Sequence, residues 1–135
     1  MRDVIRMEPV AHAELVAHCR AGLPNEACGY LVGEAGHIVR FVPVTNAAAS
    51  PTRFALDPHE QLTIEQELEA NGETVVGVAH SHPTGDNEPS AVDIDDAGRF
   101  DPLGTWVHTV VNPRSGSVRA FRIEDGAVSE LDLRF

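Results

Sequence analysis

The chain has 135 residues, of which 42% are hydrophobic and 23% charged, a composition typical of one soluble globular domain that we expect to span residues 1–135. Its formal net charge of −11 disfavours nucleic acids and anionic membrane surfaces as partners. The sequence has no apolar run long enough for a membrane span and no signal-peptide pattern at its start, so we expect a cytoplasmic protein.

The first part of the chain alternates apolar runs with turn residues. We expect strands and one helix here, over Val4–Met7 (strand), Ala11–Ala21 (helix), Ala27–Val32 (strand), Ile38–Val44 (strand) and Arg53–Leu56 (short strand). Asp57 followed by Pro58 is a typical helix start, an N-cap with proline in the first turn. This second helix is expected to end near Asn71-Gly72.

A valine-rich strand opens the second part of the chain and is followed by a loop, a helix and three more strands. The expected ranges are Thr74–Ala79, Pro83–Pro89, Ser90–Arg99, Trp106–Val111, Ser117–Ile123 and Ala127–Leu133. Helices lie between some of the strands, and the last three strands form an antiparallel meander. This order predicts a single α/β (α+β) domain with a mixed β-sheet flanked by helices.

The segment with the clearest chemistry is His80-Ser81-His82-Pro83, followed by Ser90 and Asp93. His80 and His82 are two residues apart at the end of a strand, where alternate side chains share a face, so both imidazoles can converge on one ion. Asp93 adds a carboxylate from the first turn of the next helix. Two nitrogen ligands and one oxygen ligand leave one position of a tetrahedral zinc ion open, as in catalytic sites. The sequence therefore predicts a hydrolase whose nucleophile is a metal-activated water.

Two further residues of this region have more than one interpretation. Ser90-x-x-Asp93 also fits a capping box, and taken alone this interpretation is favoured, although a helix cap can present a ligand at the same time. Glu26, just before an apolar strand, is the candidate general base, because a partly desolvated carboxylate beside a metal is suited to proton transfer. The alternative is that Glu26 is a simple loop residue after Pro24-Asn25.

In type, order and spacing, Glu26, His80-Ser81-His82-Pro83 and Ser90-x-x-Asp93 resemble the signature of the JAMM (MPN-plus) metalloproteases. Other segments resemble the small bacterial members of this family, namely Pro24–Gly29, Val44–Asn46, Ser50–Thr52 and Phe121–Gly126. The resemblance implies a cytidine-deaminase-like JAMM/MPN fold and one Zn²⁺ ion per chain. It implies that His80, His82 and Asp93 are the metal ligands. It also implies that Glu26 is the general base and that Ser90 steadies the oxyanion of the reaction.

Members of this family cleave amide or isopeptide bonds after the C-terminal Gly-Gly of ubiquitin-like proteins. The segment from Asp93 to Trp106 is too short to hold the insertion and second zinc of the eukaryotic deubiquitinases. The resemblance therefore favours the bacterial type, which releases an amino acid such as cysteine from sulfur-carrier proteins or trims extra residues from them. We expect a zinc metallopeptidase or isopeptidase whose partner is a ubiquitin-like or sulfur-carrier protein.

Two alternatives stay open, a metal-free MPN scaffold that binds proteins and a DNA-repair-associated JAMM-like protein. The intact ligand set disfavours the scaffold, and the charge of −11 disfavours the DNA-associated type. Family members often dimerise, so a homodimer is one option for the assembly. The sequence leaves open the carrier, the released group and the roles of Cys28, His37, His59 and His108. Structural or solvent-exposed roles are favoured for these three histidines.

Overall fold

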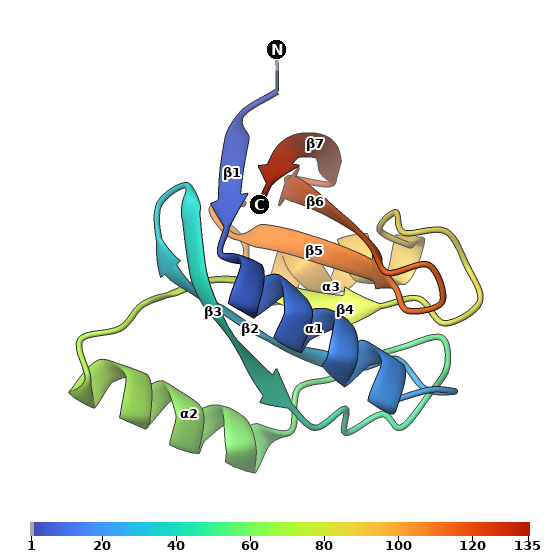
Figure 1. The fold of residues 1–135 in the computed structure, drawn as a ribbon, viewed down its shortest axis with the longest axis horizontal. Helices are drawn as coiled ribbons and strands as arrows, with labels where there is room; N and C mark the ends of the chain where they lie inside the picture. The colour runs from blue at the N-terminus through green and yellow to red at the C-terminus, as the bar shows by residue number, and fades with distance from the viewer. Residues whose placement is uncertain (1) are drawn as a thin grey trace.

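The structure is a computed structural model that describes residues 2–135, in which strands and helices alternate along the chain (Figure 1). The strands are β1 (Val4–Met7), β2 (Cys28–Glu34), β3 (His37–Val44), β4 (Val75–Ser81), β5 (Val107–Asn112), β6 (Ser117–Glu124) and β7 (Ala127–Arg134). The helices are α1 (Pro9–Ala21), α2 (Pro58–Ala70) and α3 (Ala91–Phe100). Among residues 2–135, none of the helices combines the length and the apolar character that a bilayer crossing requires.

The strands form one mixed sheet that closes into a barrel in the order β1-β3-β2-β4-β5-β6-β7. Strand β1 closes the barrel, because it pairs in parallel with both β3 and β7. Strands β4 and β5 are also parallel, whereas β5, β6 and β7 form the predicted antiparallel meander. In Figure 1, α1 lies in front of the sheet and α3 behind it. The predicted α+β class with a mixed sheet is confirmed, and the closure of that sheet is an addition to the prediction.

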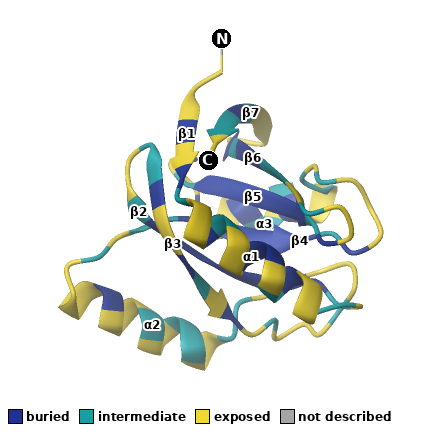
Figure 2. Ribbon diagram, viewed as in Figure 1, coloured by how far each residue is buried: buried dark blue, intermediate teal, exposed yellow. Residues whose placement is uncertain are grey.

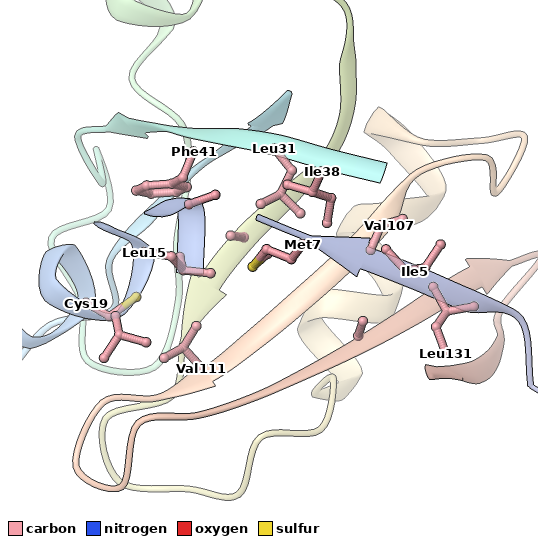
Figure 3. Packing of buried hydrophobic residues seen from close by; sticks show 14 of the residues in the cluster. Ile5, Met7, Leu15, Cys19, Leu31, Ile38, Phe41, Val107, Val111 and Leu131 are labelled. Atoms are coloured by element: carbon pink, nitrogen blue, oxygen red, sulfur yellow. The ribbon is translucent and has the colours of Figure 1, made fainter. Parts of the chain in front are cut away.

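The main hydrophobic cluster fills the space between α1 and the sheet (Figure 3). Helix α1 contributes its buried residues Ala11, Leu15, Val16 and Cys19, which share one helix face. Figure 2 shows β4 and β5 as almost continuously buried strands, whereas α2 is largely exposed. Leu68 is the residue of α2 that is fully buried. The centre of the molecule, where β4 and β5 run side by side, is therefore the most completely buried part of the fold.

Two sequence-based expectations need correction. Arg53–Leu56 is not a strand, because it forms only an isolated bridge between Leu56 and Asn46, and its backbone binds the side chain of Asn46. Strand β4 continues to Ser81 instead of ending at Ala79, because β5 runs alongside it and pairs with its last residues. The first two residues of the His-Ser-His motif therefore belong to the strand.

Candidate metal centre

Strand β4 places the two histidines of the motif on one face. His80 pairs with Cys28 of β2 on one side and with Val110 of β5 on the other. His82 follows the strand, and its backbone N–H donates to the carbonyl of Val111 over 2.9 Å, which keeps it in the extended register. The side-chain alternation of a strand then brings the Nε2 atoms of His80 and His82 to 3.2 Å from each other.

Helix α3 supplies the carboxylate through its first turn. The predicted capping box is present: the backbone N–H of Asp93 donates to Ser90 Oγ over 3.1 Å, and the backbone N–H of Ser90 donates to Asp93 Oδ2 over 2.8 Å. The same Oδ2 atom lies 3.0 Å from Nε2 of His80 and 3.0 Å from Nε2 of His82. The helix cap and the contact with both imidazoles are therefore made by one carboxylate.

The three facing atoms have the spacing and chemistry of a cation site. Tetrahedral zinc with bonds of about 2.0–2.1 Å holds neighbouring ligand atoms about 3.3 Å apart, close to the observed 3.0–3.2 Å. The Nδ1 atom of His82 lies 2.9 Å from the carbonyl of Asp86 and donates to it, since a carbonyl only accepts. In the neutral ring, Nε2 of His82 then presents a lone pair to the carboxylate of Asp93. Two acceptors facing each other require a cation or a proton between them, so the residues fit a metal.

Burial and hydrogen bonding within this cluster shift the pKa values of Asp93 and His82. Burial opposes ionisation of Asp93, but the hydrogen bonds with His80 and His82 outweigh it and hold the pKa of Asp93 well below its usual range. Burial also opposes the charged form of His82, yet its hydrogen bonds to Asp93 and to the carbonyl of Asp86 raise its pKa. The site therefore favours a carboxylate anion with positive charge beside it.

Glu26 lies in the same cluster, although it is distant in the sequence. Its side chain and those of His80, His82 and Asp93 each offer a ligand atom, and these atoms all lie within 4.8 Å of one another. Glu26 precedes β2 in a coil, as the loop interpretation expected, but it is only 4% exposed. Its Oε1 atom is buried without a hydrogen-bond partner among residues 2–135. Burial raises the pKa of Glu26 to about 8, with His82 acting against this shift and Asp93 adding to it.

Ser90 shares a groove with Glu26. A cavity of about 170 Å³ is lined by both residues and by Pro51, Thr52, His82, Pro83, Thr84 and Gly85. Since Ser90 Oγ already accepts from the backbone of Asp93, its own O–H group stays free to donate. The structure therefore brings all five predicted site residues to one place, with one open side.

Two neighbours of the cluster were missed by the motif. Phe54 stacks on the ring of His80 with centroids 4.5 Å apart and an angle of 18° between the rings. It also lines a second cavity of about 250 Å³ together with Leu56, Phe100 and Trp106. Asn46 binds the backbone carbonyl of Glu26 over 2.9 Å. Asn46 lies in the segment Val44–Asn46 that resembles the family, but the resemblance assigned it no role, and Phe54 was expected only as part of a short strand.

The three histidines left unassigned by the sequence, His37, His59 and His108, lie in structural or exposed positions, as was favoured for them. His108 contacts Asp101 over 2.9 Å in a pair that is almost fully buried. His37 contacts Glu8 over 2.7 Å at the surface. His59 is exposed in the first turn of α2. Cys28 is buried and has a free thiol.

Comparison with known proteins places the chain in a family. Residues 8–124 match the model of the prokaryotic homologs of the JAB domain. A CysO-cysteine peptidase of Mycobacterium tuberculosis is 40% identical over 86% of this chain and 80% of its own length. A desampylase of Haloferax volcanii is 39% identical over 62% of this chain and 65% of its own length. A solution structure of a protein from Desulfitobacterium hafniense has a TM-score of 0.84 at 32% identity, over 96% of this chain and 91% of that one. The chain thus belongs to the prokaryotic homologs of the JAB domain, the JAMM/MPN type of hydrolase.

Proposed function

We propose that this chain is a zinc-dependent peptidase or isopeptidase that cleaves the amide bond after the C-terminal Gly-Gly of a ubiquitin-like or sulfur-carrier protein. The observation that carries the proposal is the buried convergence of Glu26, His80, His82 and Asp93 within 4.8 Å. The names of the relatives, a CysO-cysteine peptidase and a desampylase, support the choice of substrate class. Residues 1–135 would act as one catalytic domain in the cytoplasm, with one Zn²⁺ ion per chain.

His80, His82 and Asp93 would hold the metal through two nitrogen atoms and one oxygen atom. A zinc ion held by such ligands polarises a carbonyl group and acidifies water. The contact between His82 Nδ1 and the carbonyl of Asp86 orients this imidazole, as partners of metal-bound histidines do. The two hydrogen bonds of the capping box similarly fix the carboxylate of Asp93.

Glu26 would accept a proton from the attacking water and pass it to the amine that leaves. Its buried Oε1 has no competing donor among the described residues, so the acceptor is free for this role. Burial raises its pKa to about 8 in the protein alone. A dication beside a carboxylate favours the charged form, so the pKa in the loaded site lies below this value. Glu26 would then be in the charged form that a general base requires.

Ser90 would donate a hydrogen bond from its hydroxyl group to the oxygen that gains negative charge during the attack. Its Oγ is held by the backbone N–H of Asp93, so the donor is oriented before the substrate arrives. Removing one such preorganised donor typically costs about 10²–10³ in rate. The groove that Ser90 lines together with Glu26 and His82 would hold the scissile bond.

The proposal is tested with ubiquitin-like carriers that bear short C-terminal extensions, read by intact mass, together with zinc analysis of the purified protein. We expect Glu26→Gln to keep stoichiometric zinc and to lose cleavage by at least about 10²-fold, because the base is removed and the ligands stay. His82→Ala should lose both zinc and cleavage. His59→Ala, an exposed histidine outside the cluster, is the matched control and should keep both.

Three results would contradict the proposal. Near-normal turnover of Glu26→Gln would remove Glu26 from the mechanism. Stoichiometric zinc in His82→Ala would refute that ligand assignment. A wild-type protein that is folded and free of zinc would point instead to an MPN scaffold.

A further inference from the structure

Asn46 joins Glu26 to the loop that follows Asn46 in the chain. Its Nδ2 donates to the carbonyls of Glu26 over 2.9 Å and of Arg53 over 3.0 Å. Its Oδ1 accepts from the backbone N–H groups of Ala48 and Ala55, both over 3.0 Å. These contacts use all the hydrogen-bonding capacity of an asparagine amide. The opposite orientation of the amide would set donors against donors and acceptors against acceptors, so the assignment of N and O is unambiguous.

The backbone around Glu26 is held from two directions. Its N–H donates to the carbonyl of Ser50 over 2.8 Å, so the loop after Asn46 binds Glu26 on both sides of its Cα. The next N–H, that of Ala27, donates to Oγ of Ser81 over 2.9 Å. Ser81 is the middle residue of the His-Ser-His motif and is fully buried. Glu26 is therefore fixed between the strand that carries the histidines and the loop that Asn46 organises.

The same loop, residues 47–55, forms part of the two cavities described above. Pro51 and Thr52 line the groove of about 170 Å³ that contains Glu26, His82 and Ser90. Phe54 lines the cavity of about 250 Å³ and stacks on His80. A shift of this loop would therefore move residues that line each cavity. It would also move the ring of Phe54, which stacks on the candidate metal ligand His80.

We propose that Asn46 is a positioning residue that holds the Glu26 carboxylate at the metal cluster and residues 47–55 in place as a substrate-binding wall. This rests on the proposed function for the role of Glu26. None of the hydrogen bonds of Asn46 within the described residues reaches His80, His82 or Asp93. Asn46 thus acts on proton transfer and on substrate placement, and it reaches the metal-ligand candidates only indirectly, through the stacking of Phe54 on His80.

Two variants of Asn46 distinguish the role of its amide NH2 group from the role of its amide oxygen. Asn46→Asp is nearly isosteric and keeps an oxygen for Ala48 and Ala55, but it sets a second oxygen against the carbonyls of Glu26 and Arg53. Asn46→Ala removes all four hydrogen bonds. Asn71→Ala is the matched control, because Asn71 is an exposed asparagine at the end of α2, away from the cluster. The measurements are kcat and KM on extended carriers, the zinc dissociation constant by chelator competition, and amide hydrogen exchange.

For Asn46→Asp we expect kcat to fall by about tenfold to 100-fold, since small displacements of a catalytic group cost this much. Its KM should stay close to wild type, and the amides of Ala48 and Ala55 should stay protected. For Asn46→Ala we expect the same loss of kcat, a higher KM, and faster exchange at Glu26 and over residues 47–55. Zinc affinity should be unchanged in Asn46→Asp, and in Asn46→Ala it should fall by less than the loss of about 10–100-fold that removing a partner of a metal ligand causes.

Three outcomes would overturn the proposal: wild-type kcat in Asn46→Asp, weakened zinc binding in Asn46→Asp, or faster exchange that spreads to β5–β7 as in global destabilisation. The exchange measurement also separates the two proposals. If the wild-type protein cleaves no carrier while Asn46→Ala loosens only Glu26 and residues 47–55, the proposed function fails and the link between Asn46 and Glu26 is retained. If exchange at Glu26 is unchanged in Asn46→Ala, the link itself is refuted.

Discussion

At the scale of single residues, two buried histidine–aspartate contacts in this protein have different consequences. Asp101 accepts from His108 over 2.9 Å and from the backbone N–H groups of Thr105 and Trp106, so its hydrogen bonding is completed within the fold. The cluster around Asp93 instead leaves Nδ1 of His80 and Oε1 of Glu26 without partners among residues 2–135. Unpaired buried polar atoms carry a free-energy cost that a structural pair avoids. This difference indicates that the cluster around Asp93, and not the pair of Asp101 and His108, is a site for chemistry.

His108 leads to a prediction about pH. Burial lowers its pKa below 6.5, while the contact with Asp101 acts in the opposite direction; His80 and Asp93 act on it from further away. The unfolded chain therefore binds this proton more readily than the folded protein, and the stabilisation from the neutral ring is lost as the pH falls below about 6.5. We expect the thermal unfolding midpoint of the wild type to fall relative to that of His108→Gln between about pH 7 and pH 5, because the raised pKa values of Glu26 and His82 act in the opposite direction but equally in both proteins.

The exposed His59 provides the control for this measurement. His59→Gln should reproduce the pH dependence of the wild type, because His59 is exposed on α2 and lies outside the buried pair of His108 and Asp101. If the unfolding midpoints of wild type and His108→Gln change equally with pH, His108 does not contribute to the pH dependence of stability.

At the scale of secondary-structure elements, α3 couples the stability of a helix end to the placement of a ligand. The capping box between Ser90 and Asp93 satisfies two backbone N–H groups at the helix start. Helix α2 has a comparable cap, because the side chain of Asp57 accepts from the N–H groups of His59 and Glu60, both over 3.0 Å. The two helices thus begin by the same local rule, but only α3 begins at the cluster.

The two caps can be compared by mutation. Ser90→Ala and Asp57→Ala should each lower the free energy of unfolding by about 1 kcal/mol, the usual cost of losing an N-cap. We expect only Ser90→Ala to lower turnover of an extended carrier, by about 10²-fold, because only Ser90 faces the groove. Chemical denaturation and single-turnover kinetics on the same samples measure both effects. Full turnover in Ser90→Ala would leave Ser90 with the capping role alone.

At the scale of the whole molecule, the fold depends on a short first strand that closes the barrel. Strand β1 pairs with β3 and with β7, so it joins the two ends of the sheet. Its residues alternate, with Val4 exposed and Ile5 buried in the main cluster (Figure 3). Strands β4 and β5 lie in the middle of the strand order, paired with β2 and β6, and β1 joins the two ends of the sheet that are furthest from them.

Neighbouring residues of β1 allow a matched test of this closure. Ile5→Ala should lower the free energy of unfolding by about 2–5 kcal/mol, as for other large-to-small changes in a packed core. Val4→Ala, one residue earlier and 48% exposed, should change it by less than about 0.5 kcal/mol. Equal effects in denaturant titrations would show that closure by β1 adds little to the stability of the core.

The sequence by itself determined the features of this protein that depend on neighbouring residues. Alternation along a strand aligned His80 with His82, and the spacing of Ser90 and Asp93 defined the start of α3, because both follow from local backbone geometry. Only the tertiary structure decided which distant segments meet. The closure of the barrel, the extension of β4 by its pairing with β5, and the burial of Glu26 beside the histidines all depend on contacts between strands far apart in the chain. The contacts of Asn46 and Phe54 with the cluster depend on tertiary structure for the same reason, since an irregular loop has no periodicity that shows where its side chains point.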